Sequence, residues 1–72
     1  MEVKIALFQK GLRATYKIQQ IDSITFNAIL RDFTGDSRPP DFIKFYKSDS
    51  GWRSAYNDGE LIRELGSAIE NH

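Results

Sequence analysis

The chain has 72 residues and no cysteine, and its ten basic residues balance ten acidic ones. This length is enough for one domain, which we expect to cover residues 1–72. The lack of cysteine excludes disulfides, zinc–thiolate sites and thiol catalysis, and a formal net charge of zero argues against nucleic-acid and polybasic membrane binding, which usually require an excess of basic residues.

Three segments alternate apolar and polar residues with a period of two, which is typical of half-buried strands. They cover residues 2–8, 12–19 and 24–31. In the second segment Tyr16 and Ile18 share the apolar face, while Lys17 points to the opposite side. The third segment has one exception, because Ile29 is an apolar residue on the polar side.

The turns between these segments predict a strand register. A two-residue loop at 10–11, with Gly11 at a positive φ angle, suits a type I′ hairpin. A three-residue loop at 21–23 keeps the apolar faces of the next two strands together. The cross-strand pairs that these loops predict are Leu7–Ala14, Ile5–Tyr16 and Ile18–Phe26.

Residues 32–41 interrupt the alternation and contain two prolines, which cannot sit inside a strand ladder. We therefore expect a long loop there, and long loops are often functional. Arg38, between a serine and the two prolines, is a candidate binding residue in this loop.

Residues 42–47 and 52–56 predict a second hairpin around a turn at 48–51. A loop with an even number of residues would place Tyr46 opposite Arg53, where the guanidinium can stack on the ring. It would bury Trp52 in the core or at its edge and would group Tyr56 on the same face. An odd loop would instead group Trp52 and Tyr56 with Phe42, Lys44 and Tyr46. We favour the even loop because it keeps Lys44 and Arg53 together on the solvent-exposed side.

The last segment predicts an amphipathic helix. Asn57 as the N-cap and Glu60 three residues later resemble a capping box, and the small residue Gly66 would let a strand approach the helix. The apolar stripe consists of Leu61, Ile62, Leu65, Ala68 and Ile69.

These elements predict an α+β fold: an antiparallel β-meander of about five strands with one C-terminal helix packed on one face. The other face of the sheet would be left toward solvent. The alternative is a small open barrel with the helix plugging one end.

The even hairpin register brings aromatic and basic side chains together on the uncovered face. Such a face suits a peptide, a partner protein or single-stranded nucleic acid. The candidate binding residues are Phe42, Lys44, Tyr46 and Arg53, with Arg38 as a separate candidate.

No residue pattern predicts catalysis. His72 is the only histidine and the last residue, where an imidazole cannot be held in place, and the aspartates mostly lie where turns and helix caps use them. We expect no enzyme, no cofactor and no metal site. We expect instead a cytoplasmic protein-interaction module that associates with a protein partner or with a second copy of itself; the alternative is a nucleic-acid-binding accessory protein.

Overall fold

A computed structural model of the chain describes residues 1–71 and contains one sheet and one α-helix. A short 3₁₀ turn, η1, joins the first two strands. The elements are β1 (Glu2–Leu7), η1 (Phe8–Lys10), β2 (Leu12–Gln20), β3 (Thr25–Thr34), β4 (Phe42–Ser48), β5 (Gly51–Ser54) and α1 (Gly59–Glu70).

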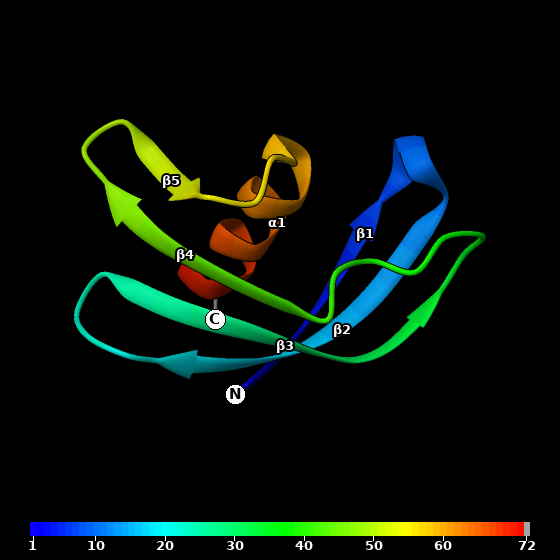
Figure 1. Cartoon of the computed structure of the whole chain (residues 1–72), viewed down its shortest axis with the longest axis horizontal. Coiled ribbons are helices and arrows are strands. Elements are labelled where there is room, and N and C mark those ends of the chain that lie inside the picture. Colours follow the sequence, from blue (N-terminus) through cyan, green and yellow to red (C-terminus); the bar gives the residue numbers. More distant parts are fainter. Residues whose placement is uncertain (72) are drawn as a thin grey trace.

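All five strands are antiparallel and follow one another in the sheet in chain order. The sheet curls around α1, which lies in its concavity and contacts the edge strands β1 and β5 (Figure 1). The predicted α+β meander with a C-terminal helix is therefore confirmed. The sheet stays open between β1 and β5.

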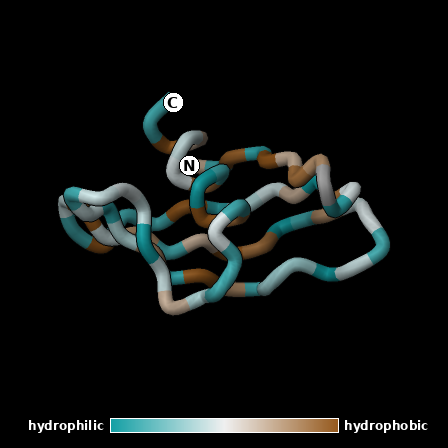
Figure 2. The backbone as a smooth tube through the Cα atoms, turned by 90° about the horizontal axis from the view of Figure 1, so that it is seen from above, coloured by the Kyte–Doolittle hydropathy of each residue, from teal (hydrophilic) through white to brown (hydrophobic). Residues whose placement is uncertain are grey.

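The core lies between the concave face of the sheet and the helix. Its largest fully buried side chains are those of Tyr16 and Phe45 on the sheet side and Leu61 and Leu65 on the helix side. Apolar and polar residues alternate along the strands, as the brown and teal segments of Figure 2 show. Because successive side chains of a strand point to opposite faces, this alternation divides the sheet into an apolar inner face and a polar outer face.

The turn between β1 and β2 is longer than the sequence predicts. Residues 8–10 form η1, and Gly11 adopts a φ of 59° while its backbone N–H donates to the carbonyl of Phe8 at 3.2 Å. The loop thus has four residues instead of two, and Leu7 pairs with Leu12. The predicted pairs Leu7–Ala14 and Ile5–Tyr16 are wrong by two positions, although every side chain keeps its predicted face.

The turn between β2 and β3 lies at residues 22–24 and not at 21–23. The carboxylate of Asp22 accepts hydrogen bonds from the backbone N–H groups of Ile24 and Thr25, at 3.0 and 2.8 Å. This side-chain turn holds Ile24 outside the strand, where 49% of it is exposed. Ile18 consequently pairs with Ala28, and not with Phe26 as predicted.

Strand β3 continues to Thr34 and shortens the predicted loop at 32–41. A β-bulge makes this possible, since the register shifts by one residue between Thr15 and Tyr16 and leaves Arg31 unpaired in the ladder. After the bulge Phe33 lies opposite Ala14 and packs against the core from the inner face. The loop that remains covers residues 35–41.

The second hairpin has the even register that the sequence predicts. A two-residue turn at 49–50 pairs Tyr46 with Arg53 and Lys47 with Trp52. Trp52 lies at the edge of the core, with its ring centroid 5.5 Å from that of Phe45. Tyr56 does not join this face as predicted, because β5 ends at Ser54, and Tyr56 is 41% exposed.

Helix α1 begins one residue later than the predicted capping box. Asp58, not Asn57, is the N-cap, and its carboxylate accepts a hydrogen bond from the N–H of Leu61 at 3.2 Å. The indole of Trp52 packs directly on Gly66, where an added Cβ would lie 2.2 Å from the ring. The predicted close approach of a strand at this glycine is therefore confirmed.

Candidate functional site

Four of the five predicted binding residues lie together on the outer face of the sheet. Phe42, Lys44 and Tyr46 alternate along β4 and therefore share a face, and Arg53 lies opposite Tyr46 on β5. Phe42 is 56% exposed and Tyr46 is 43% exposed. We call these four residues the aromatic–basic cluster. Large rings with this much exposure are available for contact with a partner.

The contact between Arg53 and Tyr46 differs from the prediction. The guanidinium of Arg53 donates from Nε and Nη2 to the hydroxyl of Ser50, at 3.2 and 2.7 Å. The cation–π contacts within residues 1–71 are instead those of Arg38 with Phe33 and of Lys47 with Trp52. The exposed ring of Tyr46 is therefore not covered by the guanidinium.

Apolar surface extends from the cluster onto β3. Ile29, the apolar residue that breaks the alternation in the sequence, is paired with Phe42. Adjacent side chains of paired strands lie about 5 Å apart, so these two residues form one apolar contact on the outer face. The exception to the alternation at Ile29 therefore marks the apolar part of this site.

Basic side chains cover the rest of the outer face. The strand register places on this face four cations outside β4 and β5, and the bulged Arg31 reaches Glu2 at 3.9 Å. Among residues 1–71, the carboxylates on this face are those of Glu2 and Asp32. The outer face therefore has a net charge of +4, from Lys4, Arg13, Lys17, Arg31, Lys44 and Arg53 against Glu2 and Asp32.

The bulge also shapes this face. A hollow of about 280 Å³ lies beside it and is lined in part by Lys4, Arg13 and Asp32. Arg13 and Lys17 lie on the outer face beside the predicted site but were not among the predicted binding residues. The period-two pattern was sufficient to find them, because only the parity of a position decides its face.

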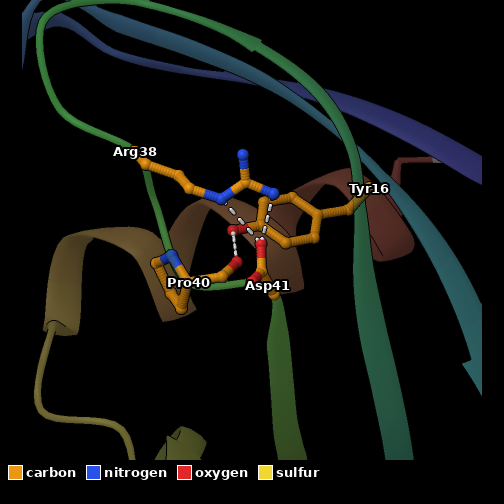
Figure 3. A network of polar contacts seen from close by, with 4 residues as sticks. All are labelled: Tyr16, Arg38, Pro40 and Asp41. Carbon is orange, nitrogen blue, oxygen red and sulfur yellow. Dashed lines mark hydrogen bonds and ion pairs between the residues drawn. The ribbon is translucent and has the colours of Figure 1, made fainter.

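Arg38 lies apart from the other four candidates, on the concave side of the sheet. Its guanidinium donates to one carboxylate oxygen of Asp41, at 2.9 and 2.6 Å, and lies over the ring of Phe33. Beside it, the hydroxyl of Tyr16 donates to the carbonyl of Pro40 at 2.7 Å (Figure 3). Arg38 thus fastens the 35–41 loop to the mouth of the curled sheet.

A cavity of about 340 Å³ opens beside this loop. Arg38, Lys10 and Asp58 supply its charged walls, and Tyr56 supplies an aromatic one. Each cation already has a carboxylate partner, since Lys10 pairs with Asp58 and Arg38 with Asp41. The first pair holds the turn at η1 to the start of the helix, and the second holds the middle of the proline loop to its C-terminal end.

The titratable groups with shifted pKa values all have structural partners. The Lys10 ammonium lowers the pKa of the Asp58 carboxyl, and Asp58 raises the pKa of Lys10. The backbone N–H of Ile24 lowers the pKa of Asp22, and Lys47 lowers that of Glu70. These shifts follow from caps, turns and surface ion pairs, which perturb carboxylates without any catalytic role.

Within residues 1–71, no three histidine, cysteine, aspartate or glutamate side chains gather as metal ligands would. His72 lies outside the described residues. None of the helical segments in the described part of the chain has the length and apolar character needed to cross a membrane. Comparison of the chain with protein-family models, with curated proteins and with solved structures finds no match.

Proposed function

We propose that this chain is a non-catalytic protein-interaction module and that it binds its partner through the outer face of the sheet. The observation that carries the proposal is the aromatic–basic cluster, in which two large rings stand exposed on one strand with a cation between them. Aromatic residues and arginine are enriched in protein interfaces and supply most of their binding energy. The outer face offers both, on a rigid strand pair.

The charge of the outer face favours a different protein over a second copy of the chain as the partner. A symmetric dimer through this face would bring two surfaces of +4 charge against each other. Like charges across an interface oppose association. A second copy would therefore have to use another surface.

The proposal is tested by capture of partners from cells of the source organism. The tagged chain is used as bait, and a captured protein is identified, purified and titrated against the isolated chain. In the Phe42→Ser/Tyr46→Ser double variant we expect affinity for that partner to fall at least about 100-fold, since hot-spot aromatics typically contribute 2 kcal/mol or more each.

The matched control is Phe8→Ser, which removes a ring that is 83% exposed on the η1 turn, away from the outer face. It should bind the partner as the parent does. Equal binding by the double variant would contradict the proposed surface. Capture that is abolished by nuclease treatment would instead favour the nucleic-acid alternative.

A further inference from the structure

The outer face carries cations that no carboxylate neutralises. The ion pairs within residues 1–71 use Lys10, Arg31, Arg38 and Lys47, and only the pair of Arg31 lies on the outer face. The other basic residues of this face form no ion pair with a carboxylate of the described chain. They are Lys4, Arg13, Lys17, Lys44 and Arg53.

Charge is thus segregated in a chain that is neutral overall. Because the outer face has a net charge of +4, the rest of the sequence has a net charge of −4. The acidic excess lies in the turns, the proline loop and the helix. Opposite charges across an interface fix the choice of partner and speed its approach.

From this segregation we infer that the partner segment bound by the outer face is an acidic polypeptide segment that also carries apolar side chains. The inference rests on the proposed function and adds the chemistry of the partner. The carboxylates of the segment would meet Lys44, Arg53 and Lys17. Its apolar side chains would contact Phe42 and Tyr46, which lie four residues apart on β4, or about 13 Å.

Two features favour a polypeptide over a single-stranded nucleic acid. Glu2 and Asp32 lie among the cations of the β1–β3 half of the face and would repel a continuous run of phosphates. The rest of the sequence, with its net charge of −4, would also repel a long polyanion that extends beyond the outer face. A polypeptide can place its carboxylates at intervals and avoid the two acidic positions.

The experiment uses a fluorescein-labelled synthetic peptide in which glutamates alternate with serines and two leucines are included. A peptide with lysine in place of glutamate and an oligo(dT) of equal negative charge are the comparison probes. Binding is followed by anisotropy, and the site by amide chemical shifts of Lys44, Tyr46 and Arg53. Trp52 is unsuitable as a fluorescent reporter, because its ring is on the opposite face.

We expect the acidic peptide to bind the parent chain. Its affinity for the Lys44→Glu/Arg53→Glu variant should be at least about tenfold lower. Its affinity should also fall with added salt, because exposed charges are screened over about 8 Å at physiological ionic strength. The control away from the outer face is Arg63→Glu, a single reversal of an exposed cation on α1 without a carboxylate partner in the described chain. It should bind the acidic peptide within about twofold of the parent, far below the tenfold change that corresponds to 1.4 kcal/mol.

Three results would overturn the inference. They are no binding of the acidic peptide, tighter binding of oligo(dT) than of the peptide, or the same loss in Arg63→Glu as in the double reversal. Its failure is distinguishable from failure of the proposed function. If binding of a captured protein still depends on Phe42 and Tyr46 while the acidic peptide does not bind, the proposed interaction surface stands and only the acidic character of the partner is wrong.

Discussion

Gly66 has no side chain, and the ring of Trp52 fills the space that one would occupy. An added Cβ would lie 2.2–2.4 Å from three atoms of the Trp52 ring, which is held in turn by Phe26, Phe45 and a hydrogen bond to Glu70. Gly66→Ala should therefore destabilise the protein by about 1–3 kcal/mol through overpacking, despite the gain of about 1 kcal/mol in helix propensity. Urea unfolding monitored by circular dichroism measures the change.

The control for this variant is Gly59→Ala at the other end of the same helix, where an added Cβ meets nothing within 4 Å. It should leave the free energy of unfolding unchanged or slightly raise it. If Gly66→Ala were as stable as Gly59→Ala, the indole would have to move at no cost, and the tight packing of Trp52 on the helix would be wrong.

Tyr16 links the core to the proline loop and makes stability depend on pH. Burial raises the pKa of its phenol from 10.0 to about 12. The unfolded chain therefore loses this proton first, so stability is complete below about pH 10 and declines as pH rises toward 12. Two pKa units set an upper limit of about 3 kcal/mol on the loss.

Tyr16→Phe isolates this effect, since it keeps the ring and removes the hydroxyl that donates to Pro40. At pH 8 it should be less stable than the parent by about 1 kcal/mol, the usual net value of one hydrogen bond. Between pH 10 and 12 the parent should approach and then fall below the variant. A constant difference from pH 8 to pH 12, measured by urea unfolding, would contradict the assignment.

At the scale of elements, α1 is required because it covers the concave face. Leu65 is completely buried at its centre. Leu65→Asp would place a charge in the core, at a cost of several kcal/mol, which is comparable to the whole stability of so small a domain. We expect no cooperative thermal transition by circular dichroism. Ser67→Asp, on the exposed side of the same helix, should melt within a few degrees of the parent.

The strands show what a sequence pattern can predict and what it cannot. Parity alone assigned the residues of the first two hairpins to their correct faces, except that Ile24 lies in the turn before β3 and is exposed. The register was wrong by two positions in both, because a shift of two leaves every side chain on the same face and satisfies the apolar pattern equally well. What decided the register was local: the 3₁₀ turn ending at Gly11 and the carboxylate of Asp22 bonded to the next strand.

In the candidate site, too, the alternation of residues predicts which face a strand residue occupies, but it does not predict the position of a loop residue. The aromatic–basic cluster depends only on parity and on an even hairpin loop, and both were predictable from the sequence. The position of Arg38 was not, because a loop has no period that relates its residues to a face. Asp41, Phe33 and the mouth of the sheet determine where its guanidinium lies. The bulge at Arg31, which extends β3 and brings Phe33 to the core, also had no signal in the alternation.

At the scale of the whole molecule, the formal net charge of zero is the sum of a positive outer face and a negative remainder of the chain. Neutral proteins tend to self-associate because little net repulsion separates the copies. Here the outer face, which carries the largest exposed rings of the sheet, also carries a net charge of +4. That charge opposes the symmetric contact through which the rings would otherwise be buried between two copies.

We therefore expect a monomer of 8.3 kDa by sedimentation equilibrium at low salt. Lys17→Glu/Lys44→Glu would cancel the net charge of the face while leaving Phe42 and Tyr46 exposed, and this variant should self-associate more strongly than the parent. Arg63→Glu reverses a cation that lies off the outer face on α1 and forms no ion pair in the described chain, and it should stay monomeric. A dimeric parent whose outer-face amides are protected from hydrogen exchange would show instead that the rings outweigh the repulsion, and would make a second copy the partner of this surface.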